Sequence, residues 1–354
     1  MTYDEITNGG IGTALAIKTA DPNALVSGPI ISGWYQYFYS QLDVTNGYAT
    51  GPCYDPWSNP TDRQTHGGVP LIEYYLQQMA TASQTYGVRL LDYVDVHAYF
   101  AADYNGVTVG TSTAGDTGEQ QARMNSTRVF WDPTYTDPDL PQPNYSTDTG
   151  YDGTNCTIPL VAPKIIPRMQ SWVTNDYPGT KTSIDEYNFG GNESINGAVT
   201  QADLLGIFGE YGLDMAELWP TTNYTAQVPA TMAFEIYRNY DGNKSTFGNT
   251  ALSSASANQG ALSVYGATRS SDNAITIVVI NKTYGALTST LSLANYPETT
   301  AATAESFLYS NANLNAIVAQ PGVTVTLPVA GSATSTITST FPAQSITLLV
   351  IPPI

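Results

Sequence analysis

Residues 182–191 read Thr-Ser-Ile-Asp-Glu-Tyr-Asn-Phe-Gly-Gly, and this stretch predicts a short β-strand that ends in a carboxylate. Glu186 is followed by an aromatic residue, an amide and two glycines, so the strand would deliver its carboxylate to the mouth of a sheet. Enzymes with parallel sheets keep their catalytic groups at the carboxyl ends of the strands. The stretch therefore predicts an α/β fold with a functional site at Glu186.

Strand and helix patterns alternate along the first two-thirds of the chain. We expect strands at 24–27, 90–99, 182–186 and 215–218, and helices at 2–20, 69–86, 164–176, 197–211 and 228–239. Four strand–helix repeats indicate parallel strands joined by helical crossovers, and they amount to half of an eight-unit barrel. The long loop at 101–159 is expected either to be functional or to carry small elements.

Residues that start and stop helices support two of these boundaries. Thr2 is followed three residues later by Glu5, which is the spacing of a capping box. Pro70 lies near the start of the second helix and Gly87 directly after its end, as proline and glycine commonly do.

The pattern changes after residue 247. Short β-rich runs occur at 261–268, 274–281, 288–293, 306–309, 323–327 and 345–351, separated by turn residues. No helical period appears among them. We therefore expect a C-terminal all-β domain at 248–354, folded as a sandwich, after an α/β domain at 1–247.

The charge balance argues against nucleic acid as a partner. The 354 residues carry a net charge of −18 and include only 12 Lys and Arg. Phosphate backbones are bound by clustered Lys and Arg, so a neutral substrate fits better. Only 12% of the residues are charged, and Ser, Thr, Asn and Gly take their place. This composition is typical of secreted carbohydrate-active proteins.

Signals for a metal, a disulfide or a membrane are weak. Cys53 and Cys156 are the only cysteines, and the two histidines show no paired spacing typical of zinc. A Cys53–Cys156 disulfide and two free thiols are both compatible with the sequence. Loop Asp and Asn residues could bind calcium, although no stretch fits an EF-hand. No apolar run approaches the roughly 20 residues of a membrane span, and an export signal would lie outside this sequence.

Several short motifs together resemble glycoside hydrolase family 44. They are Gly28-Pro29, Gly33-Trp34, the segments 92–99 and 127–135, and the stretch 182–191. The likeness runs through most of the chain. That family contains retaining endo-β-glucanases and xyloglucanases, so the resemblance implies a cofactor-free glycoside hydrolase whose partner is a polysaccharide.

The resemblance further implies that the chain matches the second half of the family's catalytic barrel. In the family, an Asn-Glu-Pro motif at the end of the fourth strand carries the acid/base glutamate, and a helix resembling residues 3–20 follows. No Asn-Glu-Pro occurs here. We therefore expect about strands 5–8 of a TIM (β/α)8 barrel followed by a β-sandwich, without the strand that carries the acid.

Glu186 is the predicted nucleophile. Glycoside cleavage with retention uses two carboxyl groups about 5–5.5 Å apart, one to attack the anomeric carbon and one to protonate the leaving oxygen. Glu186 matches the family's nucleophile by resemblance. Without the resemblance, it could equally be a solvated strand-end residue or a helix cap. Glu217, one strand along, is a competing carboxylate.

His97 and Tyr99 end the strand that precedes Glu186 in the predicted sheet. They occupy alternate positions, so their side chains point to the same face. A hydrogen bond from either one to Glu186 would stabilise the ionised nucleophile. A satisfied core histidine is an equally good interpretation of His97 alone.

Three tryptophans are candidate sugar platforms because an indole ring offers a flat apolar face with one polar handle. Trp219 resembles the family's tryptophan that stacks on a sugar ring, and Trp34 and Trp131 lie in loops after earlier strands. Core packing is the alternative for each of them. Tyr187 and Asn188 are also predicted to contact substrate, with the Asn188 amide bonded to sugar hydroxyls.

We conclude from the sequence that this is part of an exported β-1,4-glucan hydrolase. Cellulose-type chains, xyloglucan and xylan are all candidate substrates. One alternative is a non-catalytic carbohydrate-binding protein that keeps the aromatic groove. Another is an inactive fragment, because half a parallel barrel exposes two strand edges. The sequence leaves the oligomeric state open.

Overall fold

The chain forms two compact units in a computed structural model that describes residues 1–50, 60–137, 140, 160–219, 229–296, 302–328 and 334–353. Unit 1 comprises Met1–Phe100, Arg128–Asn188 and Tyr211–Trp219, and unit 2 comprises Ala101–Thr127, Phe189–Glu210 and Pro220–Ile354. Cys53 and Cys156, for which the sequence left a disulfide and two free thiols open, lie outside the described residues.

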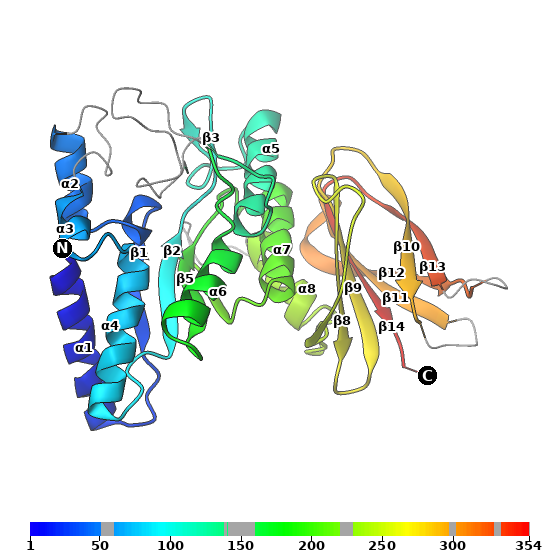
Figure 1. The fold of residues 1–354 in the computed structure, drawn as a ribbon. Helices are drawn as coiled ribbons and strands as arrows, with labels where there is room; N and C mark the ends of the chain where they lie inside the picture. The colour runs from blue at the N-terminus through cyan, green and yellow to red at the C-terminus, as the bar shows by residue number, and fades with distance from the viewer. Residues whose placement is uncertain are drawn as a thin grey trace. The chain divides into compact units, whose positions relative to one another are not determined.

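Unit 1 is built on a four-stranded sheet in the order β1-β2-β5-β6 (Figure 1). The strands are β1 (Ser27–Ser32), β2 (Tyr93–Ala98), β5 (Lys181–Tyr187) and β6 (Met215–Leu218). All three pairings are parallel, as the alternation of strands and helices predicts. The first strand begins at Ser27, later than expected, and Val26 O just before it accepts the N–H groups of Asp92 and Tyr93.

Helices precede and separate these strands. Those of unit 1 are α1 (Tyr3–Ala20), α2 (Gln41–Thr50), α3 (Thr61–Thr65), α4 (Leu71–Tyr86) and α6 (Ile165–Asp176), with short 3-10 turns η1 (Tyr35–Tyr37) and η2 (Thr127–Phe130). The capping box predicted for Thr2 and Glu5 is present. Gly87 ends α4 in the left-handed conformation that favours glycine. Helix α4 contacts both α1 and α6.

The sheet of unit 1 is open on both sides among the described residues. Strand β1 pairs only with β2, and β6 pairs only with β5. An open edge presents main-chain N–H and C=O groups that a closed barrel would pair. The structure thus contains four parallel strands of the kind that build a barrel, but the described strands do not close into one.

Unit 2 contains most of the antiparallel strands. Its six-stranded sheet has the order β12-β11-β14-β9-β8-β7, and β10 pairs separately with β13. The strands are β7 (Thr250–Leu252), β8 (Leu262–Arg269), β9 (Ala274–Asn281), β10 (Leu287–Ala294), β11 (Ala302–Ser310), β12 (Asn313–Val325), β13 (Thr334–Phe341) and β14 (Ser345–Ile351). Side chains of both sheets, including Val279, Leu349 and Phe341, share one core.

The long loop after β2 carries small elements, which was one of the two predicted alternatives. They are β3 (Asp103–Tyr104), β4 (Val107–Thr108) and α5 (Thr117–Ser126), all in unit 2. Arg123 of α5 is fully buried and donates to the carbonyls of Val109, Ala114 and Phe189. The Arg123 guanidinium thus connects this loop by hydrogen bonds to the segment that follows β5.

Two helices expected in the α/β domain belong to unit 2. They are α7 (Ile195–Glu210) and α8 (Pro229–Arg238). This grouping differs from the expected division at residue 247. Helix α7 belongs to unit 2 because it packs against β8, β9 and β14. An apolar helix is buried by whichever sheet covers it, and sequence order does not specify which one.

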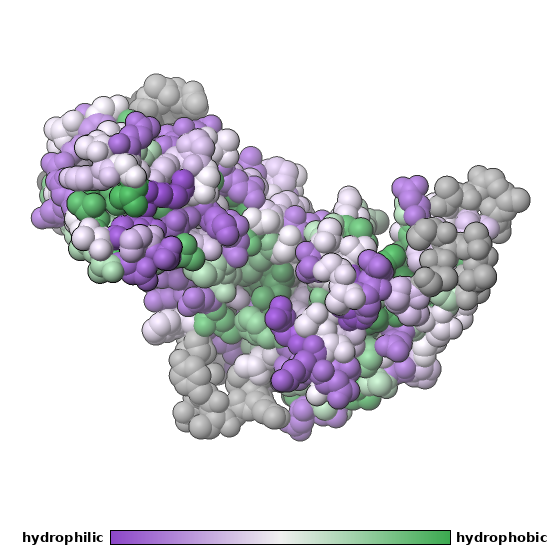
Figure 2. Space-filling view, turned by 90° about the horizontal axis from the view of Figure 1, so that it is seen from below, coloured by the Kyte–Doolittle hydropathy of each residue, from purple (hydrophilic) through white to green (hydrophobic). Residues whose placement is uncertain are grey.

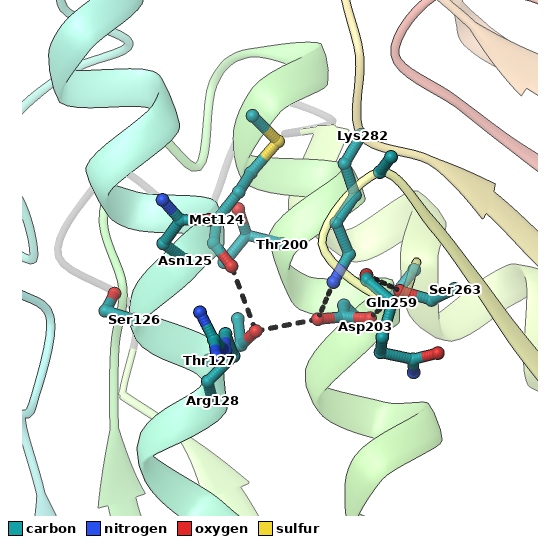
Figure 3. A network of polar contacts seen from close by, with 12 residues as sticks. Met124, Asn125, Ser126, Thr127, Arg128, Thr200, Asp203, Gln259, Ser263 and Lys282 are labelled. Carbon is teal, nitrogen blue, oxygen red and sulfur yellow. Dashed lines mark hydrogen bonds and ion pairs between the residues drawn. The ribbon is translucent and has the colours of Figure 1, made fainter. Parts of the chain in front are cut away.

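Asp203 of α7 is the centre of a buried polar network (Figure 3). Its carboxylate accepts hydrogen bonds from Thr127 at 2.7 Å, Ser263 at 2.6 Å and Tyr265 at 2.8 Å, and it pairs with Lys282 Nζ at 2.7 Å. The four contacts come from three segments of unit 2, because Ser263 and Tyr265 both lie in β8. The network therefore fixes α7 against α5, β8 and the residue after β9.

Hydrophilic and intermediate residues cover much of the face shown in Figure 2, with smaller apolar areas between them. This matches a composition rich in Ser, Thr and Asn and poor in charge. In the described part of the chain, no helix combines the length and apolar character needed to span a bilayer.

Candidate active site

The candidate site lies where β2 and β5 end side by side in unit 1. The register pairs His97 with Glu186 and Ala98 with Tyr187. The two strands are parallel, so their carboxyl ends meet at the same edge of the sheet. The predicted nucleophile and the predicted histidine are therefore neighbours across the ladder.

Glu186 Oε2 is held from two directions. The Tyr99 hydroxyl donates to it at 2.8 Å, and His97 Nδ1 lies 3.3 Å away. No hydrogen bond or ion pair involves Glu186 Oε1 among the described residues, and 25% of the side chain is exposed. Burial, followed by the bond to Glu186, raises the pKa of the Tyr99 phenol, so Tyr99 stays a donor at neutral pH. The structure brings together the three side chains that the sequence predicted as neighbours.

Asp185 completes this group and was not predicted from the sequence. Its Oδ1 lies 3.3 Å from His97 Nε2, so the imidazole has a carboxylate at each nitrogen. Consecutive residues of a regular strand point to opposite faces. Here the register shifts between Asp95 and His97, and that irregularity lets Asp185 and Glu186 both contact His97.

Asp95 adds a third carboxyl beneath this group. It is buried, its Oδ1 accepts the Asp185 N–H at 3.1 Å, and its Oδ2 has no hydrogen-bond partner among the described residues. Burial, followed by the negative charge of Asp95, raises the pKa of the Asp185 carboxyl to about 6. The ends of β2 and β5 therefore concentrate negative charge around one imidazole.

Trp219 follows β6 and is 53% exposed. Its N–H donates to Tyr187 O at 3.0 Å, and its carbonyl accepts from Asn188 Nδ2 at 2.6 Å. These two bonds fix the main chain of Trp219 next to the residues that follow Glu186. With respect to the described residues, the exposed ring can offer an apolar face to a ligand.

Two other predicted contact residues do not reach the surface. Tyr187 and Asn188 are both fully buried. The Asn188 amide is bonded to the main chain of Trp219, so the expected bond to sugar hydroxyls is replaced by a structural one. In this structure both side chains serve the fold, and the prediction that they contact substrate stays a prediction.

The other two tryptophans are not platforms beside Glu186. Trp34 is 4% exposed and packs edge-on against Phe38 and Phe100, with the Arg168 guanidinium over its ring. Trp131 stacks on Tyr211 with a centroid separation of 5.5 Å. Tyr211 precedes the start of β6, so it lies near the amino ends of the parallel strands, whereas Glu186 lies near their carboxyl ends.

The glycines after Glu186 also have a structural explanation. A Cβ on Gly190 would lie 2.1 Å from Val109 O, and one on Gly191 would lie 2.9 Å from the Arg123 guanidinium. Both have positive φ angles that favour glycine. The two glycines therefore let segments of the chain approach one another closely at this point.

A second catalytic carboxyl is not evident beside Glu186. Asp185 contacts the far nitrogen of His97, and exposed Glu217 forms no hydrogen bond or ion pair with the described residues. Within the described ranges, no three His, Cys, Asp or Glu side chains are grouped so as to hold a metal ion. Cavities of about 350 Å³ in unit 2, beside Glu210, and about 290 Å³ in unit 1, beside Arg168, do not include Glu186.

Known proteins are similar to this chain in sequence and in fold. A family model described as glycoside hydrolase family 44 matches residues 1–102. Endoglucanase A of Paenibacillus lautus is 34% identical over 283 residues, which cover 79% of this chain and 36% of that protein. The chain thus spans about a third of the length of this relative.

Solved structures agree with this comparison. CelM2, a bifunctional glucanase-xylanase from a metagenome library, superposes with a TM-score of 0.82 at 36% identity over 100% of this chain and 60% of that one. A Paenibacillus polymyxa xyloglucanase of the same family, solved with xyloglucan, gives 0.77 at 25% identity over 100% of this chain and 62% of that one.

Proposed function

Because the chain belongs to glycoside hydrolase family 44, we propose that it takes part in the cleavage of β-1,4-glucan chains with retention of configuration, with Glu186 as the nucleophile. The observation that supports this role is the asymmetric environment of the carboxylate. Oε2 is held by Tyr99 and faces His97, whereas Oε1 has no partner among the described residues. Oε1 is thus left to attack an anomeric carbon.

The first step forms an ester between Glu186 Oε1 and the anomeric carbon while the bond to the leaving oxygen breaks. Glu186 loses its negative charge as the ester forms, and water later releases the sugar and restores the carboxylate. The Tyr99 hydroxyl orients the carboxylate between turnovers through its hydrogen bond to Oε2, and the His97 ring lies beside the same oxygen. Trp219 would stack on the C–H face of a neighbouring sugar ring.

We assign the proton donor to elements beyond the four strands of unit 1. Retention places a second carboxyl about 5–5.5 Å from the nucleophile, and neither Asp185 nor Glu217 occupies such a position by its contacts. The open edges of β1 and β6 support the proposal that these strands are about strands 5–8 of a TIM barrel. Further strands would pair with both edges and bring the acid.

The proposed substrate is a soluble β-glucan such as xyloglucan, and the proposed location is extracellular. The names of the relatives support the substrate class, since they include an endoglucanase, a glucanase-xylanase and a xyloglucanase. The low content of charged residues supports export. Calcium bound by loop carboxylates remains a prediction.

Trapping with a 2-fluoro-cellobioside that carries a dinitrophenyl leaving group tests the nucleophile without a proton donor. The phenolate leaves as an anion, and the electron-withdrawing fluorine slows hydrolysis of the ester. We expect a peptide containing Glu186 to gain the mass of the fluorinated sugar. Glu186→Gln should abolish the label and the control Glu217→Gln should keep it. A label on another residue would contradict the assignment.

The second candidate is a non-catalytic carbohydrate-binding protein. It is favoured by the lack of an evident second carboxyl, together with the exposed ring of Trp219. Calorimetric titration with xyloglucan oligosaccharides on the same sample separates the two functions. Binding without covalent labelling would support the second.

A further inference from the structure

Unit 2 contains a cavity of about 350 Å³ whose lining includes no residue of unit 1. The lining comes from the carboxyl-terminal ends of α7 and α8, from strand β8 and from the segments around β7. Binding sites for small molecules have volumes of about 300–1,000 Å³. The cavity is therefore large enough for a small ligand and is formed by one compact unit.

Aromatic rings form part of the cavity wall. Tyr237 and Phe247 pack edge-on, with ring centroids 5.1 Å apart. The Tyr265 ring lies against Gly206, where a Cβ would come within 2.2 Å of it. The Tyr237 hydroxyl donates to a main-chain carbonyl of α7 at 3.0 Å, and the Tyr265 hydroxyl donates to Asp203 at 2.8 Å. These bonds hold both tyrosine rings in place, so the wall is preformed.

Two charged side chains of opposite sign also line the cavity. Glu210, at the end of α7, is part-buried, and Arg238, at the end of α8, is exposed. Neither forms a hydrogen bond or an ion pair with the described residues. Burial, followed by the charge of Asp203, raises the pKa of the Glu210 carboxyl to about 7. Near neutral pH this carboxyl can therefore donate as well as accept a hydrogen bond.

These walls and charges select the class of ligand. A cation is repelled by the Arg238 guanidinium and an anion by the Glu210 carboxylate, so neither gains a net attraction. A purely apolar molecule would bury both polar groups without partners, which is costly. A sugar ring is uncharged, offers C–H faces to aromatic rings, and carries hydroxyls that both donate and accept hydrogen bonds.

We propose that this cavity is a saccharide-binding site that takes a neutral sugar ring. Tyr237 and Phe247 supply the apolar contact, and Glu210 and Arg238 bond the sugar hydroxyls. The site is independent of the proposed role of Glu186, because all of its residues belong to unit 2.

Gly209 allows the cavity to be filled without a clash. It lies in α7 on the cavity lining, and a Cβ there would meet no atom within 4 Å. Gly209→Leu therefore adds a side chain where the ligand would bind. The matched control is Gly12→Leu, because Gly12 also lies in a helix, α1, has equally open space at its Cβ, and belongs to unit 1.

Hydrogen–deuterium exchange with cellobiose locates the site. In the wild-type chain, we expect cellobiose to protect peptides from residues 205–210, 234–238 and 247–254. The affinity measured from this protection should fall by about tenfold or more in Gly209→Leu, since the added side chain occupies the volume of the ligand. It should stay within about twofold in Gly12→Leu, as for substitutions remote from a site.

Glu210→Ala is a second variant that keeps the test valid if Gly209→Leu does not fold. We expect its affinity for cellobiose to fall by about 2–10-fold, which is the contribution of one hydrogen bond. An unchanged affinity in Glu210→Ala, equal affinities in Gly209→Leu and wild type, or no protection of these peptides would each overturn the proposal.

Charged and apolar probes test the choice of ligand. Glucosamine is a cation, glucuronate is an anion and p-cresol is an apolar phenol, and each should protect these peptides less than cellobiose does. Stronger protection by any of the three would refute a site for neutral sugars. The labelling of Glu186 by the fluorinated cellobioside reports separately on the proposed function and should be the same in Gly209→Leu and wild type.

Discussion

Unit 1 and unit 2 each hold an aspartate paired with a basic side chain, and the two pairs are built differently. In unit 2 the side chains of Asp203 and Lys282 are 1% and 4% exposed, and three hydroxyl groups donate to the Asp203 carboxylate. In unit 1, Asp185 Oδ1 faces His97 at 3.3 Å without a well-aligned hydrogen bond. One pair is fully satisfied, whereas the other is not.

The difference separates a structural charge pair from a functional one. A buried carboxylate with four donors fixes the geometry of the chain segments around it. Burial and the neighbouring charge of Asp95 instead raise the pKa of the Asp185 carboxyl to about 6, so this carboxyl exchanges its proton near neutral pH. Proton exchange near neutral pH is useful in an active site and harmful in a core.

Glu186→Gln should give the largest effect and act only on unit 1. We expect the hydrolysis of dinitrophenyl cellobioside to fall by on the order of 10⁴-fold or more, as when other catalytic nucleophiles are removed. The urea midpoint should stay the same, because the substitution keeps the shape of a part-exposed side chain. Release of dinitrophenolate is the measurement. Activity equal to that of the wild type would mean that the Asp185–His97 pair does not belong to an active site. The contrast with the Asp203–Lys282 pair would then fail.

Asp203→Asn should act on stability instead. The amide keeps the shape of the carboxylate but leaves the Lys282 ammonium buried without a counter-charge, at a cost of about 3–5 kcal/mol in the free energy of unfolding. Urea denaturation measures the loss. The control is Asp272→Asn, because Asp272 pairs with Arg269 at 2.8 Å on the surface, and such pairs contribute about 0–1 kcal/mol. Equal losses in the two variants would contradict the buried role of Asp203.

Two tryptophan variants sharpen the contrast between core and site within unit 1. Trp34→Ala should destabilise the fold by about 3–5 kcal/mol, since it empties a packed position. Trp219→Ala should leave thermal stability nearly unchanged but weaken xyloglucan binding by about 1–3 kcal/mol, because its ring is half exposed. Thermal unfolding measures the stability of each variant, and calorimetric titration measures its affinity for xyloglucan. Unchanged affinity in Trp219→Ala would remove it from the proposed site.

Glu210 should show a small pH effect in unit 2. Burial, followed by the charge of Asp203, raises the pKa of the Glu210 carboxyl to about 7. The native state then binds the proton more tightly than the unfolded chain, so this group lowers stability as pH rises from about 4.5 to 7, and the penalty is complete above that range. Glu210→Gln should therefore be more stable than wild type at pH 8, by roughly 1 kcal/mol after allowance for solvent.

Thermal unfolding at several pH values tests the Glu210 prediction. The gap between Glu210→Gln and wild type should close toward pH 4.5, where the wild-type carboxyl is protonated in both states. A gap that is constant with pH would show that the substitution acts through packing alone.

Local sequence patterns predicted much of the fold. Alternating strand and helix runs predicted four parallel strands, and Thr2 with Glu5 predicted the start of α1, because capping needs only residues three positions apart. Strand β13 was missed, since its alternating Thr and Ser residues give no apolar run. Only the structure shows that Ile337 and Phe341 of this strand are buried in the core that the two sheets of unit 2 share.

The sequence by itself determined that Glu186 ends a strand beside His97 and Tyr99, because residue order within parallel strands decides which side chains reach the same edge. Only the tertiary structure decided that Asp185 joins them, since a register shift is set by the pairing of two strands. It also decided that Trp34 is buried while Trp219 is exposed, and that Asp203 meets Lys282 across 79 positions. Burial and long-range pairing depend on which surfaces meet, and residue type alone does not specify that.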